Sequence, residues 1–456
     1  MEVGGPRRDA RCRRALQGRP RRIPDHDKER WLPRSGARGQ LGRLWSAEGF
    51  ALAAGLVQSL VVARALGPDL FGVYALVFTF ASLVFVVLDP RSGEAVVRYM
   101  TEFRAVDDLD RCRAVTRGGM LLDAAWGAGG LLLVAILAVP SSAVLHVRDY
   151  AVLMPVVALG MAATAPVATS RAILGVFERF DVVSNLQFLV ATIRVASVCA
   201  VALGGFGLPG IVWTLATVSA IECAVFVAAS LRVSRQNLGG GIRGASLSAL
   251  RGRRRAILGF VGYAGLTSLA ASAFKQLDTL LVGVLVGPSA AGYYRLAKTL
   301  TSPAASVGIP LQAVLYPRLA RAQSEGDASG GAVIVRRVFW RVELPLAGAA
   351  LLSIPFIAPV IRLLAGSDFV GAVGPTIALV VGVAVAFATL HQRPLFLVRY
   401  KLRALLLFTV AMSLGSLAVF VPAADLMGVD GVAWARTAVL ALGVGAMAVY
   451  LRSRES

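Results

Sequence analysis

Residues 66–79 read LGPDLFGVYALVFT, and residues 286–299, which lie 220 positions later, read VGPSAAGYYRLAKT. Aligned without a gap, the two stretches share six residues: Gly67 with Gly287, Pro68 with Pro288, Gly72 with Gly292, Tyr74 with Tyr294, Leu76 with Leu296 and Thr79 with Thr299. At the same offset, the basic loop that begins at Arg98 falls on the loop that begins at Arg318. The sequence therefore predicts an internal repeat. A Gly-Pro pair also marks tight turns in general, which would explain the turn but not the matching loops.

Long apolar runs surround both copies of the repeat. The chain is 57% hydrophobic and 16% charged, with a mean hydropathy of +0.70, whereas soluble domains carry about 25% charged residues. The runs are about 20 residues long, as a helix needs to cross a hydrocarbon core of about 30 Å. The predicted spans are 45–66, 71–89, 118–139, 150–171, 184–206, 210–231, 257–286, 290–315, 337–361, 371–390, 404–424 and 431–451.

These spans predict an all-α integral membrane protein with about twelve transmembrane helices. Each copy of the repeat holds six spans, an even number, so the two six-helix lobes have the same orientation and form a parallel repeat about an axis along the membrane normal. We expect a disordered basic cytoplasmic tail over residues 1–44, an N-terminal lobe over 45–231, a basic cytoplasmic linker over 232–256 and a C-terminal lobe over 257–456.

The charge distribution predicts the orientation. The chain carries a net charge of +21, and 39 of its 47 Lys and Arg residues fall in the tail, in alternate loops and after residue 451. An excess of Lys and Arg on one side marks the cytoplasmic side, so both termini are expected there. The same distribution argues against a nucleic-acid partner, because the charge follows the loops of a membrane protein.

Motifs for enzymatic or metal chemistry are missing from the sequence. The cysteines, Cys12, Cys112, Cys199 and Cys223, have no CxxC or metal-ligand spacing, so neither a disulfide nor a metal site is expected. The three histidines are scattered, and no GxxxxGK[ST] loop is present. We expect a protein that is not an enzyme and uses no cofactor.

Ionisable residues gather near the predicted midplane. With 1.5 Å per helical residue, Lys275 and Asp278 lie roughly 18 and 13 Å inward from the turn at Gly287, and Arg295 and Lys298 lie roughly 12 and 16 Å inward on the next helix. Arg194 and Glu222 also fall near mid-depth. Buried charges are costly in a membrane and indicate function or a specific partner.

This midplane set is net positive and would suit a diphosphate, whose oxygens accept charge-assisted hydrogen bonds. Alternatively, Arg194 pairs with Glu222, and Asp278 with Arg295 or Lys298, which would only lock the helices together. Asp278 is also a candidate site for a coupling ion or proton. Arg64 and Arg436 are predicted near the outer ends of their spans, where long side chains snorkel, and Arg64 is a candidate outer gate.

Several segments resemble one family of transporters. They are ARALGPDLFGVYAL at 63–76, RYMTEFRAVDDLDRCR at 98–113, FKQLDTLLVGVLVGPSAAGYYRLAKTL at 274–300, LYPRLAR at 315–321, AGSDFVGAVGP at 365–375 and GVDGVAWARTAVL at 428–440. From about residue 41 onward the chain resembles the polysaccharide transporter and oligosaccharide flippase branch of the multidrug/oligosaccharidyl-lipid/polysaccharide exporter superfamily.

The resemblance implies a two-lobed transporter that flips undecaprenyl-diphosphate-linked oligosaccharide by alternating access. Its expected partners are the lipid-linked oligosaccharide, membrane lipids and polysaccharide assembly enzymes. Two alternatives stay open at this point: a cation-coupled multidrug exporter of the same superfamily, and a membrane-embedded polysaccharide polymerase. The net-positive midplane argues against cationic drugs, and the short outer loops argue against a polymerase.

Overall fold

The computed structural model describes residues 37–272, 274–325 and 328–453, and all regular elements among them are helices. The longer helices are α3 (Ala37–Leu88), α4 (Ser92–Ala105), α5 (Leu109–Val144), α6 (Leu153–Val176), α7 (Phe180–Leu203), α8 (Gly207–Leu238), α9 (Arg254–Ser272), α10 (Phe274–Leu285), α11 (Pro288–Ser306), α12 (Gly308–Ser324), α13 (Ala328–Val338), α14 (Leu344–Leu352), α15 (Ile354–Leu364), α16 (Val373–Phe387), α17 (Gln392–Val398) and α18 (Leu402–Arg452). Within the described residues, seven helices are long and apolar enough to cross a membrane, and a bent pair makes an eighth. The predicted all-α membrane fold is confirmed.

Two of these long helices each contain two of the predicted spans. The backbone of α3 turns at Gly67, where φ is 70°, and that of α18 turns at Gly428, where φ is 59°. A positive φ is readily adopted by glycine because it has no Cβ. The predicted spans 45–66 and 71–89 therefore lie on either side of Gly67, and the last two spans lie on either side of Gly428.

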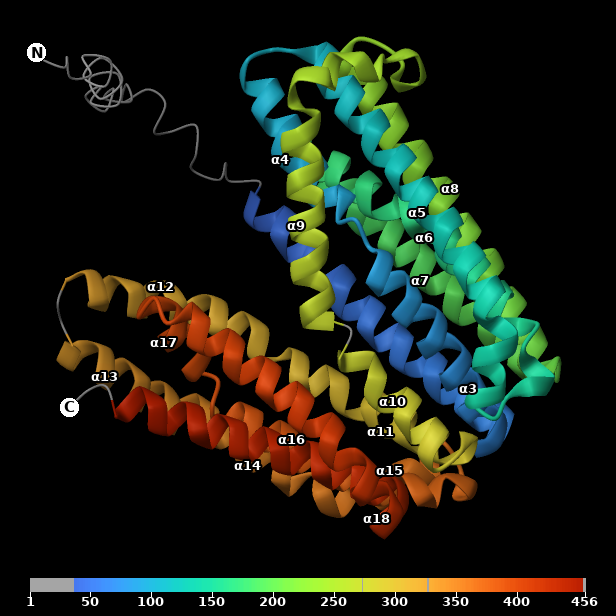
Figure 1. Cartoon of the computed structure of the whole chain (residues 1–456), viewed down its shortest axis with the longest axis vertical. Coiled ribbons are helices and arrows are strands. Elements are labelled where there is room, and N and C mark those ends of the chain that lie inside the picture. Colours follow the sequence, from blue (N-terminus) through green and yellow to red (C-terminus); the bar gives the residue numbers. More distant parts are fainter. Residues whose placement is uncertain (1–36, 273, 326–327, 454–456) are drawn as a thin grey trace, which may run out of the picture.

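The helices form two groups in Figure 1, which we call the N-terminal lobe (α3 to α8) and the C-terminal lobe (α10 to α18). The lobes meet along α3 and α11, which pack against each other. Helix α9 runs beside α4 and contacts α3 as well as α10 (Figure 1). The segment that enters the C-terminal lobe therefore touches both lobes.

The predicted tail and linker contain more structure than expected. Residues 1–36 of the predicted tail lie outside the described residues, but 37–44 are helical and extend the first span. This extension needs little stabilisation because adding residues to an existing helix avoids the cost of nucleation. Helix α8 continues to Leu238, and the linker after it is tied to the N-terminal lobe by hydrogen bonds from Arg113 to the Leu238 carbonyl (3.0 Å) and from Arg117 to the Ala245 carbonyl (2.6 Å).

The two copies of the repeated sequence contact each other reciprocally. A Cβ on Gly72 would lie 1.8 Å from the carbonyl oxygen of Pro288, and a Cβ on Gly292 would lie 2.5 Å from the carbonyl oxygen of Pro68. Ser289 donates a hydrogen bond to Asp69, which is also 220 positions away. A two-fold axis between the copies requires such a pattern, and both glycines are needed for the close approach of α3 and α11.

The lobes differ in the continuity of their helices. In the N-terminal lobe, α5 to α8 are unbroken helices of 36, 24, 24 and 32 residues. In the C-terminal lobe, α11 and α12 are separated at Val307, a π-helix (Phe339–Glu343) joins α13 to α14, and a turn separates α16 from α17. The pair α13–α14 and α15 bends by 54°. Several helices of the C-terminal lobe are therefore interrupted by breaks or bends.

Substituting Gly72 tests the reciprocal contact. We expect Gly72→Ala to destabilise the protein by about 1–3 kcal/mol, the usual cost of overpacking, because the new methyl group meets backbone. Gly129→Ala is the matched control, since open space surrounds Gly129. Thermal unfolding of the purified protein in detergent is the measurement. Equal melting temperatures for the two variants would contradict the contact.

Candidate functional site

In the N-terminal lobe, one carboxylate holds two arginines. Glu222 on α8 accepts hydrogen bonds from Arg194 on α7 at 2.6 Å and from Arg171 on α6 at 3.2 Å. The side chain of Glu222 is buried, and the Arg171 guanidinium also stacks over the ring of Phe226 at 4.8 Å. The pairing of Arg194 with Glu222 that the helix-locking alternative requires is thus present. Two arginines on one carboxylate still leave an excess positive charge.

All three residues line a cavity of 580 Å³ in the N-terminal lobe, together with Gln58 and Tyr74 of α3. The Nε atoms of Arg171 and Arg194 are buried and have no hydrogen-bond partner among the described residues. A buried donor without an acceptor is costly. These two donors are therefore available to an anionic or oxygen-rich ligand.

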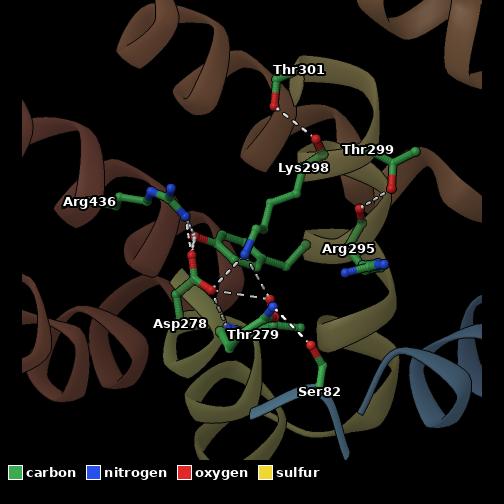
Figure 2. A network of polar contacts seen from close by, with 10 residues as sticks. Ser82, Asp278, Thr279, Arg295, Lys298, Thr299, Thr301 and Arg436 are labelled. Atoms are coloured by element: carbon green, nitrogen blue, oxygen red, sulfur yellow. Dashed lines mark hydrogen bonds and ion pairs between the residues drawn. The ribbon is translucent and has the colours of Figure 1, made fainter. Parts of the chain in front are cut away.

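In the C-terminal lobe, Asp278 of α10 is the centre of a polar network (Figure 2). Lys298 of α11 donates to its Oδ1 at 2.7 Å, and Arg436 of α18 and the Tyr294 hydroxyl both donate to its Oδ2. The backbone N–H of Thr279 donates to Oδ1 at 2.7 Å. Only 3% of Asp278 is exposed. The network joins α10, α11 and α18, and its two cations outnumber its one carboxylate.

The position of Arg436 corrects the sequence analysis, which predicted it near the outer end of its span. Arg436 lies eight residues after the turn at Gly428, as Arg295 lies eight residues after the turn at Gly287. Both are therefore about 12 Å into their helices. Counting from the glycine turn, instead of from the apolar run, would have placed Arg436 beside Asp278.

Arg171 was not among the predicted site residues, because it is the last residue of the predicted span 150–171. Helix α6 continues to Val176, so Arg171 lies inside the helix. The basic side chain ended the apolar run in the sequence without ending the helix. In the structure its charge is balanced by Glu222, a residue 51 positions away that no local pattern connects to it.

Arg295 has a different environment from its neighbours. Its Nε is buried without a hydrogen-bond partner, and no carboxylate among the described residues pairs with it. Figure 2 shows its guanidinium apart from the Asp278 network. Arg295 and Lys298 line a cavity of 360 Å³ that also includes Gln58 and Tyr74. Because the 580 Å³ cavity shares Gln58 and Tyr74, the two cavities adjoin: the larger lies within the N-terminal lobe, and the smaller lies between the lobes.

Two of the predicted site residues remain, Lys275 and Arg64. The side chain of Lys275 lies outside the described part of the structure, although its backbone belongs to α10. Arg64 donates a hydrogen bond from Nη1 to the carbonyl oxygen of Leu363 at 2.9 Å and so links α3 to the end of α15. This bond joins the two lobes next to the Gly-Pro turns.

The arrangement can bind anions. Around the two cavities, five cations (Arg171, Arg194, Arg295, Lys298 and Arg436) face two carboxylates (Glu222 and Asp278). Guanidinium groups bind phosphoryl oxygens in a bidentate geometry, and a low-polarity surrounding strengthens the attraction. No group of three potential metal ligands occurs among the described residues.

Solved structures share this fold. A multidrug resistance MATE family transporter of the MOP superfamily, in its inward-facing conformation, matches with a TM-score of 0.72 at 14% identity, over 89% of this chain and 94% of that one. The lipid II flippase MurJ, in an inward closed conformation, matches with a TM-score of 0.68 at 13% identity, over 90% and 87%. A MOP superfamily transporter from Pyrococcus furiosus matches with a TM-score of 0.55 at 13% identity, over 90% and 93%.

These likenesses define the class: an integral membrane protein with the fold of the MOP superfamily transporters. The family model described as polysaccharide biosynthesis protein matches residues 44–323, which is more than half of the chain. The chain belongs to this family, as its sequence resemblance predicted. No curated protein sequence is significantly similar to the chain.

Removal of the Asp278 carboxylate tests the network. We expect Asp278→Ala to lower the free energy of unfolding by about 3 kcal/mol, the low end of the range for breaking a buried pair, because it leaves the half-buried Lys298 and Arg436 without their counter-charge. Asp425→Ala is the matched control, since Asp425 on α18 is exposed. Thermal unfolding in detergent compares the two. If both variants unfolded at the same temperature, the network would not stabilise the fold.

Proposed function

We propose that the protein flips a lipid-linked oligosaccharide, carried on undecaprenyl diphosphate, across the bacterial inner membrane for polysaccharide biosynthesis or export. The observation that carries the proposal is Arg295, which lines a cavity between the lobes, has a buried Nε without a hydrogen-bond partner and pairs with no carboxylate among the described residues. Family membership supports the polysaccharide pathway. Polysaccharide assembly enzymes would supply the substrate and consume it after transport.

The diphosphate would bind in the two adjoining cavities. Arg295 and Lys298 contact it from the C-terminal lobe, and Arg194 contacts it from the N-terminal lobe, with Lys275 as a further predicted contact. The sugar follows the head group into the space between the lobes, while the prenyl chain stays in lipid. An anion that contacts both lobes stabilises the arrangement in which the basic residues of the two lobes lie closest together. The substrate therefore has a higher affinity for this arrangement than for the others, and this difference in affinity shifts the conformational equilibrium.

The outer side would be closed by contacts between the lobes. The reciprocal approach of α3 and α11 and the hydrogen bond from Arg64 to Leu363 both join the lobes at the Gly-Pro turns. On the orientation predicted from the basic loops, with both termini cytoplasmic, the proposed path opens inward in this arrangement. Outward opening then requires both contacts to break, which gives Arg64 the role of a gate.

Neutralising Arg295 tests the proposed site. A hydrogen bond to a charged group contributes about 1.5–3 kcal/mol, so Arg295→Gln is expected to weaken substrate binding by about ten- to a hundredfold. In a deletion strain complemented with this variant, lipid-linked oligosaccharide should accumulate in the cytoplasmic leaflet, as it does without complementation. Arg148→Gln is the matched control, because Arg148 is exposed and lines neither cavity.

Each other outcome of this experiment has a defined meaning. Full rescue by Arg295→Gln would remove the proposed site while leaving a flippase. A deletion strain whose lipid-linked pool is unchanged would argue against the flippase itself and would favour export of small amphipathic molecules.

The gating role of Arg64 is tested by the distance between the lobes. Spin labels at Ala65 and Leu364, both exposed, report on the outer contact. Because a hydrogen bond contributes about 0.5–1.5 kcal/mol, Arg64→Gln should raise the population with a longer distance by about two- to tenfold. An unchanged distance distribution, equal to that of Arg148→Gln, would rule out a gate at Arg64.

A further inference from the structure

The C-terminal lobe contains a third cavity, separate from the two adjoining cavities described above. It has a volume of 750 Å³ and lies between α12, α13, the π-helix, α17 and the last turns of α18. None of the residues that line this third cavity lines either of the two adjoining cavities. The volume is within the range of about 300–1,000 Å³ that small-molecule sites occupy.

The repeat allows this cavity to be compared with the corresponding part of the N-terminal lobe. At the offset of 220, Leu319 and Gln323 of the cavity wall correspond to Tyr99 and Phe103 of the N-terminal lobe. Both aromatic rings are buried in a hydrophobic cluster there, with 3% and 2% exposure. The C-terminal copy has smaller side chains at these two positions, and its cavity is larger than the 320 Å³ cavity that Tyr99 and Val115 line at the corresponding place in the N-terminal lobe.

The wall of the cavity is basic. Arg336 lines it where the N-terminal copy has the buried residue Thr116. Arg399 also lines it and donates to the Leu451 carbonyl at 3.3 Å, and the His391 ring lies 2.7 Å from the buried carboxylate of Glu343. The described residues that line the cavity include no Asp or Glu. The charge of the wall is therefore complementary to an anion.

The wall also holds an acceptor with no donor. Gln392 is 5% exposed, and its Nε2 donates to the Val444 carbonyl at 3.2 Å. Its Oε1 is buried and has no hydrogen-bond partner among the described residues. Buried polar atoms of this kind are rare because each one costs free energy. A ligand with a hydroxyl group as well as an anionic group would satisfy it.

Aromatic side chains place the cavity at the level of the lipid headgroups. Trp340 follows the lining residue Phe339 and is 61% exposed, and Tyr400 follows Arg399 and is 88% exposed. Trp and Tyr collect at membrane–water interfaces. On the predicted orientation this interface is the cytoplasmic one, and basic pockets between helices on that side bind anionic headgroups.

We infer that this cavity binds an anionic glycerophospholipid of the inner leaflet, with a hydroxyl-bearing headgroup such as that of phosphatidylglycerol. Arg336 binds the phosphate, and Oε1 of Gln392 accepts a hydrogen bond from a headgroup hydroxyl. The apolar part of the wall, which includes Leu319, Val335 and Leu395, receives the start of an acyl chain. This inference does not depend on which substrate the protein transports.

Lipid binding to the purified full-length protein in detergent tests the inference. Phosphatidylglycerol, phosphatidylcholine and inorganic phosphate are titrated separately, with thermal stabilisation and native mass spectrometry as readouts. Wild type should bind phosphatidylglycerol in preference to the other two. Since each basic residue near a lipid surface contributes about 1 kcal/mol, Arg336→Gln should weaken that binding about fivefold. Gln323→Phe, which restores the aromatic residue of the N-terminal copy, should also weaken it.

Arg337→Gln is the matched control, because Arg337 is the exposed neighbour of Arg336 and does not line the cavity. Its affinity for phosphatidylglycerol should equal that of wild type. Equal weakening by both arginine variants would overturn the inference, since it would indicate attraction by surface charge alone. Stabilisation by inorganic phosphate as strong as that by the lipid would also overturn it and would indicate a soluble anion.

Discussion

The close approach of two glycines in α3 and α11 constrains the rest of the structure. Gly72 and Gly292 let each helix touch the carbonyl at the start of the other, so the two lobes approach closely at their Gly-Pro turns and stay in contact along α3, α10 and α11. Small residues allow helix backbones to approach closely in membranes, where packing replaces the hydrophobic effect as the source of helix association. All other interlobe features, including the adjoining basic cavities, are positioned relative to this contact.

The charged residues follow from the same constraint. Because α10 and α11 lie next to the contact, Lys298 and Arg436 meet at Asp278, which is buried and therefore needs a partner for its charge. The network satisfies Asp278 fully and leaves excess positive charge, and Arg295 lies just outside it. Stability and the proposed recognition of an anion therefore depend on neighbouring residues of one helix, with Lys298 belonging to both.

Much of the fold and of the candidate site was predictable from the sequence, and the two site residues that were missed share a physical cause. The repeated Gly-Pro segments predicted the turns and the matching lobes, and the rise per residue placed Asp278, Arg295 and Lys298 at similar depths. Arg171 and Arg436 were missed because the ends of apolar runs are not the ends of helices. Their partners, Glu222 and Asp278, lie 51 and 158 positions away, and such distant pairs are set by tertiary packing. The identity of each partner could not be read from local pattern.

The unequal continuity of the helices has a consequence for the surrounding bilayer. The unbroken helices of the N-terminal lobe contain at least 24 residues, so they are about 36 Å long and fit a hydrocarbon core of about 30 Å by tilting or by extending their ends into the headgroup region. The C-terminal lobe can adjust its length at its breaks and bends instead. A change in the acyl-chain length of the lipids therefore changes the tilt of the N-terminal lobe and the bending of the C-terminal lobe. Hydrophobic mismatch in this way changes the angle between the two lobes.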